Sequence, residues 1–320
     1  MQLEDSIRNP IFENIWSYEF SNANKLINEN KENFKNTSPL KLIDLDILNG
    51  YCQFTQHALK SGPACIMQLW TAGKTLTSTL EQSKTKEYQA GIAWSSMLLG
   101  LCYFVEGVDK KDAQNKSNLY QKAKALWDES TLLITGDDYF QTHLKMKQAM
   151  LIEKCIEDTN EYHFNFPWAH LNELKTALDN AKYRLGKLAL SISNDSSIYK
   201  ETDVKYHYTN ARLIALKGED FSLIKSEMNN AIELANNINS IFFKTSGLMY
   251  LCVAIRETVE GLVKIDNTEK KIYELNNQFL EYASQCAAIA DAYSLEAIKH
   301  RLKNEQDRMH RLLLAKGIIH

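Results

Sequence analysis

The chain has 320 residues, of which 44% are hydrophobic and 24% charged, and its formal net charge is −3 at pH 7. These values are ordinary for a globular protein, and the lack of a strong positive charge argues against nucleic acid as a partner. Only 12 Gly and 4 Pro occur. Because sheet proteins and α/β enzymes use Gly heavily at turns and phosphate loops, this shortage predicts helices joined by short polar connections.

The sequence predicts a cytoplasmic protein. Its opening residues, MQLEDSIRNP, are acidic and polar and lack the apolar core of a signal peptide. The longest weakly polar run, AGIAWSSMLLGLCYFV at residues 90–105, is too short for a membrane span and predicts a buried helix. Single cysteines among apolar neighbours fit a reducing compartment better than a disulfide framework. They are Cys52, Cys65, Cys102, Cys155, Cys252 and Cys286.

The first residues differ from the rest in being rich in Asn, Lys and Glu. Apolar side chains recur there at Phe12, Ile15, Trp16 and Phe20. This helical spacing predicts one amphipathic helix that docks on the remainder of the protein. A segment this polar cannot bury much surface alone, so we expect an amino-terminal appendage at residues 1–39. Residues 40–320 are then expected to form a single elongated helical domain.

Helical patterns follow one another from residue 40 onwards, and no alternating pattern predicts a strand. We expect helices at residues 42–59, 64–85, 87–105, 112–135, 140–158 and 168–193, in both arms of 208–237, and at 241–265, 269–293 and 295–315. Connections this short place successive helices antiparallel. The predicted fold is therefore all-α, with antiparallel helical hairpins stacked as an irregular solenoid.

The stretch at residues 208–237 is the clearest hairpin. Its two helical arms are separated by the letters KGED at residues 217–220. Phe221, Ile224 and Ala231 take positions at which paired helices approach closely, as in a tetratricopeptide-type hairpin. The stretch GLCYFVEGVDKKDAQNKSNLYQKAKALW is similar, with a longer turn and Ala123 at the small position. The chain is repeat-like but shows no regular repeat of about 34 residues.

Three further segments point to a family. They are YQAGIAWSSMLLGLCYFVEG, NKSNLYQKAKALWDESTLLI and YFQTHLKMKQAMLIEKCIED. In order and spacing they resemble successive helices of the BRO1 domain, the helical module of the Alix and Brox type of ESCRT adaptors, with 208–237 as the last hairpin. The resemblance covers residues 87–237. It implies that an apolar concave patch binds the C-terminal helix of an ESCRT-III subunit in membrane remodelling.

The sequence offers no recognisable catalytic or cofactor motif. The chain contains no G-x-x-x-x-G-K-[ST], G-x-G-x-x-G or G-x-S-x-G pattern. Glu296 and His300 share one helix face, but no second pair completes a metal site, so a solvent-facing pair is expected. His163 and His170 flank FNFPW, where a packed loop is expected rather than catalysis. We therefore predict no enzyme activity, no cofactor and no metal.

A basic stretch raises the question of acidic partners. It consists of Lys110, Lys111, Lys116, Lys122 and Lys124, with Asp109 and Asp112 interleaved. A solvated helix face is the expected explanation, and a site for an acidic lipid or peptide is the alternative. No membrane span is predicted, whereas peripheral membrane association stays open.

The predicted partner-binding face lies on the segment at residues 168–193, since arrayed hairpins leave a concave surface on which a partner helix can lie. Its residues are Leu171, Leu174, Leu178, Tyr183 and Leu185. The alternative is that these side chains belong to the core.

These observations predict a non-catalytic helical scaffold or adaptor that binds a partner peptide or helix. One alternative is a regulator that senses a ligand or peptide, in which Asn229, Asn230 and Asn236 clamp the ligand. The other is an all-α enzyme whose site is not recognisable in the sequence.

Overall fold

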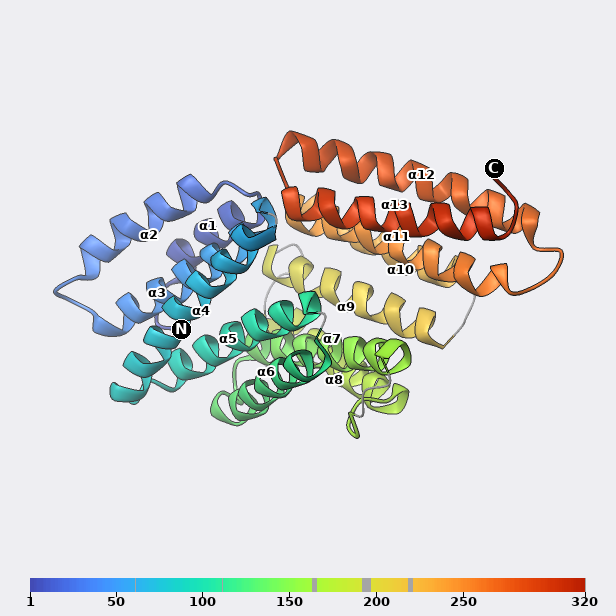
Figure 1. Ribbon diagram of the computed structural model, residues 1–320. Helices are drawn as coiled ribbons and strands as arrows, with labels where there is room; N and C mark the ends of the chain where they lie inside the picture. Colours follow the sequence, from blue (N-terminus) through green and yellow to red (C-terminus); the bar gives the residue numbers. More distant parts are fainter. Residues whose placement is uncertain (61, 111, 163–165, 192–196, 218–220, 320) are drawn as a thin grey trace.

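The computed structural model is built from helices alone in its described residues, which confirms the predicted all-α class (Figure 1). The structure describes residues 1–60, 62–110, 112–162, 166–191, 197–217 and 221–319. The helices are α1 (Asp5–Trp16), α2 (Phe20–Phe34), α3 (Pro39–Thr55), η1 (Gln56–Leu59), α4 (Gly62–Thr85), α5 (Gln89–Asp109), α6 (Ala113–Leu133), α7 (Asp138–Tyr162), α8 (Leu171–Ser191), α9 (Ser197–Leu216), α10 (Phe221–Asn237), α11 (Ile241–Val263), α12 (Glu269–Ala292) and α13 (Glu296–Ala315).

Polar capping residues and residues with left-handed backbone angles mark where the helices begin and end. Asp137 accepts a hydrogen bond from the backbone N–H of Phe140 at 2.9 Å and caps α7. Asp112 and Ser240 cap α6 and α11 in the same way. In the connections α1–α2, α4–α5, α10–α11, α11–α12 and α12–α13 the chain reverses through non-glycine residues with left-handed backbone angles, which are Tyr18, Glu87, Asn239, Asn267 and Ser294. Such residues make the turns possible in a chain with few glycines.

Residues 1–39 contain two helices, α1 and α2, instead of the single helix that the aromatic spacing predicted. The break lies at Tyr18, whose φ of 60° ends α1 and places Phe20 at the start of α2. The side chains of Ile11, Ile15 and Trp16 are buried in the main core. α1 therefore forms part of the body of the protein.

The two arms of the clearest hairpin form α9 and α10, which pack against each other. Phe221, Ile224 and Ala231 are buried on α10, at the positions that the pattern assigned to helix packing. The turn at residues 218–220 lies outside the described residues. In the similar stretch before it, a Cβ atom on Gly107 of α5 would lie 2.7 Å from the Tyr120 ring of α6, so only glycine permits this approach.

The apolar helix α5 lies inside the protein. Within the part of the chain that the structure describes, one window, Gln89–Val108, is long and apolar enough to cross a membrane. Of that window 72% is buried inside the protein, in keeping with the core helix predicted for residues 90–105. Trp127 of α6 packs on it and donates a hydrogen bond to the carbonyl oxygen of Met97 at 2.8 Å.

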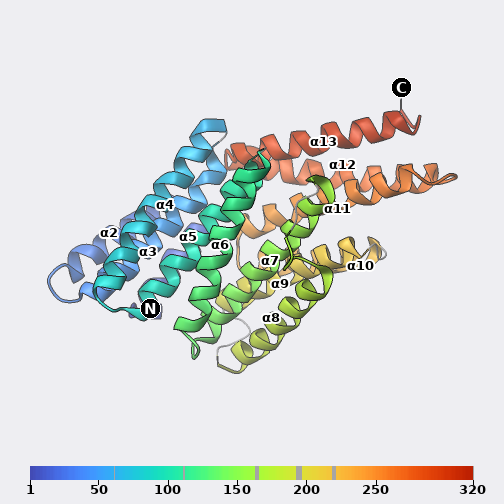
Figure 2. The same cartoon turned by 60° about the horizontal axis from the view of Figure 1, so that its bottom comes forward.

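Odd-numbered helices form an inner layer, in which α3, α5, α7, α9, α11 and α13 each contact the next (Figures 1 and 2). Contacts between successive even-numbered helices are at most marginal. The colours of both views run in order from α2 at one end to α12 and α13 at the other. The ends of the layer are also brought together, because α1 touches α11 and η1 touches α13.

Candidate partner-binding site

The inner layer carries the buried charges of the protein. Among the described residues, buried acidic and basic side chains lie on the odd-numbered helices, with the exception of Lys116 on α6. The surroundings of α9 explain why charged side chains are buried there. This helix contacts α7, α8, α10 and α11, and almost none of its described residues is exposed. A helix enclosed in this way must pair its charged groups within the protein.

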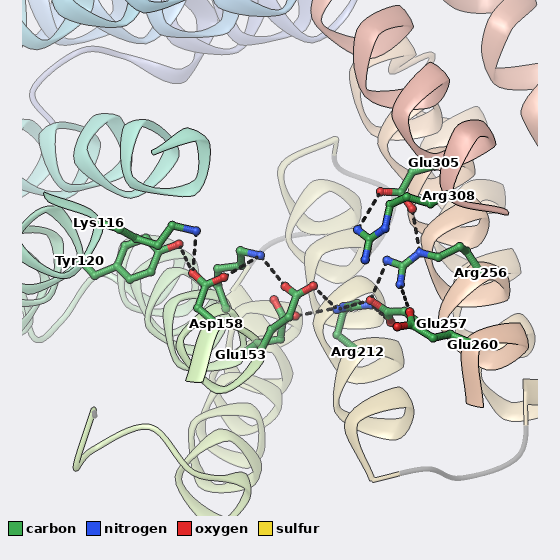
Figure 3. Close-up of polar contacts among 12 residues, drawn as sticks. Lys116, Tyr120, Glu153, Asp158, Arg212, Arg256, Glu257, Glu260, Glu305 and Arg308 are labelled. Atoms are coloured by element: carbon green, nitrogen blue, oxygen red, sulfur yellow. Dashed lines mark hydrogen bonds and ion pairs between the residues drawn. The ribbon is translucent and has the colours of Figure 1, made fainter. Parts of the chain in front are cut away.

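Arg212 of α9 is the centre of an ionic chain (Figure 3). Its Nε atom donates to Glu153 Oε1 on α7 at 3.0 Å, and its Nη1 atom donates to Glu257 Oε2 on α11 at 2.6 Å. Glu157, one turn from Glu153, adds a third carboxylate 3.7 Å from Nη2. The guanidinium thus links three consecutive helices of the inner layer.

The chain continues to α13 through Arg256 of α11 (Figure 3). This guanidinium donates to Glu305 on α13 at 2.9 Å, to Glu260 at 2.9 Å and to Glu257 at 3.3 Å. Glu257 therefore accepts from both arginines and joins their two clusters. Arg308 lies 3.8 Å from Glu305 at the outer end.

On the other side the chain extends to α6 through Asp158, whose side chain is fully buried. Tyr120 donates its hydroxyl proton to Asp158 at 2.7 Å, while the ammonium groups of Lys116 and Lys154 lie 3.2 Å and 3.3 Å away. Lys154 also donates to Glu157 at 2.6 Å. Ion pairs and hydrogen bonds consequently run without interruption across α6, α7, α9, α11 and α13.

The pKa shifts show how strongly these groups depend on one another. Burial alone would raise the pKa of Glu157, but the charges of Lys154 and Arg212 outweigh it and lower its pKa to about 2. Burial would lower the pKa of Arg212, whereas Glu153, Glu257 and Glu157 raise it well above its usual range. Glu157 and Arg212 are thus held ionised and are poor proton donors and acceptors near neutral pH, which suits a structural role in the inner layer. Burial raises the pKa of Glu153, and the charge of Arg212 acts in the opposite direction.

A second buried cluster lies on α7 and α9. His143 Nδ1 lies 3.0 Å from Lys205 Nζ, and Lys205 pairs with Glu201 one turn earlier. Burial, together with the nearby charges of Lys205 and Lys147, holds the pKa of His143 well below its usual value. Burial also lowers the pKa of Lys147 to about 8. This cluster borders a cavity of about 10 Å³, which is room for roughly one water molecule.

α1 covers this cavity and lies against the inner layer. Phe12 stacks on Trp16 at 5.5 Å between ring centroids and meets Tyr51 of α3 edge-on at 5.7 Å. Trp16 lies 6.0 Å from Phe243 of α11. Phe12 and Trp16 line the cavity together with His143. One amphipathic helix thus joins α3 to α11 through aromatic contacts.

The residues before α1 are held by Asp44 of α3. Its carboxylate accepts hydrogen bonds from the backbone N–H groups of Gln2 and Leu3, the latter at 2.9 Å, and from the hydroxyl of Tyr88 at 2.9 Å. Burial raises the pKa of Asp44, while these hydrogen bonds act in the opposite direction. A fully buried carboxylate with backbone donors is a specific anchor for an extended segment.

The residues predicted to bind a partner are divided between the core and the surface. Leu174, Leu178 and Leu185 of α8 are buried. Leu174 and Leu178 pack in a small separate cluster with Met146 of α7. This packing agrees with the alternative that these side chains belong to the core. Leu171 is half-buried, whereas Tyr183 is 62% exposed. The five side chains therefore do not form one open face in this structure, and their role with a partner stays a prediction.

The basic stretch was expected to be a solvated helix face. Lys116 differs from this expectation, because it is buried and belongs to the ionic chain. Lys110 and Lys124 do lie on the surface side, where they pair with Glu106 and with Asp128. Lys122 lies over the Tyr103 ring at 5.5 Å. Lys111 is outside the described residues.

The remaining polar candidates are not brought together. Glu296 pairs with Lys299 at 3.1 Å, while His300 lies 3.4 Å from Asn304. His170 is on the surface near Glu173, and His163 is outside the described residues. Asn229, Asn230 and Asn236 are exposed on α10. Within the described ranges no cluster of His, Cys, Asp and Glu has metal-binding geometry.

Sequence analysis missed the ionic chain and the Asp44 anchor, although a signal for each was present. Arg256 directly follows the apolar run GLMYLCVAI, and Asp44 lies with Asp46 inside LIDLDIL. A charged side chain that is buried must be paired, so charges beside or within apolar runs mark candidate sites. The identity of the partner groups depends on which helices pack together, and periodicity does not give it.

Comparisons with known proteins give no family for the chain. A scan against protein-family models finds no match, and searches of curated proteins and of solved structures find none either.

Proposed function

We propose that the protein is a non-catalytic helical scaffold that binds a helix of a partner protein against its inner layer. The observation that carries this proposal is α1, an amphipathic helix that lies on the layer and joins α3 to α11 through aromatic contacts. A surface that holds one such helix has the apolar seat and the polar anchor that helix-in-groove recognition requires.

The ionic chain supports the same proposal, because it ties α7, α9, α11 and α13 together. Removing one member of a buried ion pair is costly, so the helices keep their relative positions. The α11 side of the binding surface is therefore preformed, and a partner does not have to order it, which lowers the cost of binding. The direct contacts between odd-numbered helices also fit the predicted tetratricopeptide-like solenoid, whose inner helices line the binding side.

The resemblance to the BRO1 domain gives the proposal a more specific version. In that version the protein works in the cytoplasm as an adaptor in ESCRT-linked membrane trafficking. The partner is the C-terminal helix of an ESCRT-III subunit, and the protein associates with the membrane surface without spanning it. The support for this version is the order and spacing of the segments within residues 87–237.

The alternatives have less support among the described residues. A hollow of about 280 Å³ lies between α5 and α6 and is lined by Glu106, Lys110, Asn115, Asn118, Leu119 and Lys122. The predicted regulator needs a pocket beside the asparagines of α10, but the cavity beside His143 has room for about one water molecule. The exposed asparagines of α10 do not surround it. An all-α enzyme needs convergent titratable groups with free proton-transfer capacity, whereas the ionic chain holds its charges in pairs.

Affinity capture of the tagged full chain from its own cell extract, followed by hydrogen-exchange mapping with the recovered partner, tests the proposal. We expect the partner to protect amides in α3 and α11. Recovery of an ESCRT-III subunit would support the specific version. A Tyr183→Asp variant is the matched control, since Tyr183 is exposed on α8, outside the inner layer. Protection limited to α8, with capture lost in this variant, would move the site to the face predicted from the sequence and overturn the inner-layer proposal.

A further inference from the structure

α1 combines strong side-chain anchoring with a weak backbone. The side chains of Ile11, Phe12, Ile15 and Trp16 are buried. The helix itself has only 12 residues and contains Pro10, which lacks the N–H that would continue the helical hydrogen bonds. Isolated helices of this length are marginal in water. α1 is therefore helical because it is docked.

The hydrogen bonds that connect the end of α1 to the turn before α11 are weak in comparison with those inside the layer. Ser240 Oγ donates to the carbonyl oxygen of Trp16 at 3.5 Å, and Ser17 Oγ donates to the carbonyl oxygen of Asn239 at 3.4 Å. Both distances are at the long end for a hydrogen bond. The ionic chain joins α7, α9, α11 and α13 without any residue of α1. Departure of α1 would leave that chain intact.

We propose that α1 is a displaceable internal occupant of the partner site, and that the partner supplies an amphipathic helix with the same aromatic pattern. This inference rests on the proposed function and names the partner's chemistry. The pattern consists of two aromatic residues four positions apart, each preceded by an aliphatic residue, as in Ile11–Phe12 and Ile15–Trp16. An extended segment before that helix presents backbone N–H groups to Asp44, as Gln2 and Leu3 do.

The aromatic pattern follows from the site that α1 occupies on α3 and α11. Phe12 meets Tyr51 of α3, and Trp16 meets Phe243 of α11, so the two rings contact two different helices of the layer from one helix face. Residues four apart on a helix lie one above the other, which places both rings in line. An occupant without the second aromatic residue would lose its contact with α11.

Competition between α1 and a partner sets the apparent affinity. A partner can bind only to molecules whose site is open, so its affinity is reduced by the open fraction. Substitutions in α1 that weaken its docking raise this fraction and leave the seat on α3 and α11 unchanged. Binding of an added helix should then become tighter.

The test uses the full-length chain and a fluorescent synthetic peptide of residues 1–19 as the probe. The double variant Phe12→Ala, Trp16→Ala is expected to bind this peptide at least about tenfold more tightly than the unaltered chain, because its own α1 competes poorly. The matched control is Phe279→Ala, which truncates a buried aromatic residue on α12, outside the helices that α1 packs against. It should show no gain, and a peptide carrying Trp16→Ala should bind at least about tenfold more weakly than the native peptide.

Hydrogen exchange of the unaltered chain provides a measurement that does not depend on the folding of a variant. If α1 opens by itself, the amides of residues 11–16 exchange about 100-fold faster or more than the most protected amides of α9. Equal rates in α1 and α9, or equal peptide affinity in the double variant and the control, would overturn the proposal. A scaffold that binds its partner beside a permanently docked α1 would still be possible after that result. If no recovered partner protects the amides of α3 and α11 from exchange, that result would instead count against the proposed scaffold function.

Discussion

Arg212 and Glu257 come from helices that adjoin in the inner layer, and the guanidinium Nη1 atom donates to the carboxylate at 2.6 Å. Arg212 is buried and also donates to Glu153, which is buried as well. Loss of the guanidinium would leave the buried Glu153 carboxylate without its cation, whereas Glu257 keeps its bond to Arg256. Substitution of Arg212 therefore measures how much the ionic chain contributes to the free energy of unfolding.

Arg212→Met should lower the free energy of unfolding by about 3–5 kcal/mol, since it leaves a buried carboxylate unpaired. Urea denaturation measures the change. The control is Lys175→Met, which breaks the exposed pair with Asp179 on α8 and should cost less than about 1 kcal/mol. Adding Glu153→Gln to Arg212→Met should recover part of the loss. Equal effects of the two single substitutions would show that the chain does not stabilise the layer.

Glu157 predicts how stability changes in acid. Its pKa of about 2 in the folded protein lies below the value of about 4.3 expected when unfolded. The unfolded state therefore binds the proton first as the pH falls, and the contribution of Glu157 to stability is lost between these two values. The difference in unfolding free energy between the unaltered chain and Glu157→Gln should be full near neutral pH and disappear towards about pH 2. If the difference in unfolding free energy between the two proteins does not change with pH, the lowered pKa of Glu157 is contradicted.

Two glycines should respond to alanine in opposite directions. A Cβ atom on Gly247 of α11 would lie 2.6 Å from the Tyr208 hydroxyl and 2.8 Å from Ile232 Cγ1. Gly247→Ala should therefore cost about 1–3 kcal/mol through overpacking. Gly186 lies in α8 with nothing within 4 Å of its Cβ position, so Gly186→Ala should stabilise by about 0.5–1 kcal/mol. Thermal unfolding of both variants checks the signs.

The predicted face on α8 can be divided by its exposure. Leu178→Ala should cost about 2–5 kcal/mol, because this side chain is buried between helices. Tyr183→Ala should change the unfolding free energy by less than about 0.5 kcal/mol, since Tyr183 is exposed. If the face binds a partner, only the second substitution can show it without unfolding the protein. Comparable losses from both would contradict the packing described for α8.

Periodicity predicted the helices well because it reports which side of a helix is apolar. The pattern at residues 64–85 matches α4, and Ala231 lies between helices as expected. Phe20 was assigned to the same helix as Phe12 because spacing alone does not reveal the left-handed turn at Tyr18. The seat of Trp16 beside Phe243 was not predicted at all, since a contact between distant segments leaves no local pattern.

The place of α1 on α11 has a consequence during synthesis of the chain. Trp16 and Ser240, which meet in the folded protein, are 224 positions apart. At about 5–20 residues per second, the ribosome needs roughly 10–45 seconds between these two residues. Throughout that time Ile11, Phe12, Ile15 and Trp16 have no α11 to cover them. The nascent protein thus exposes these apolar side chains for a long time, and it would be a natural client for a chaperone until α11 emerges.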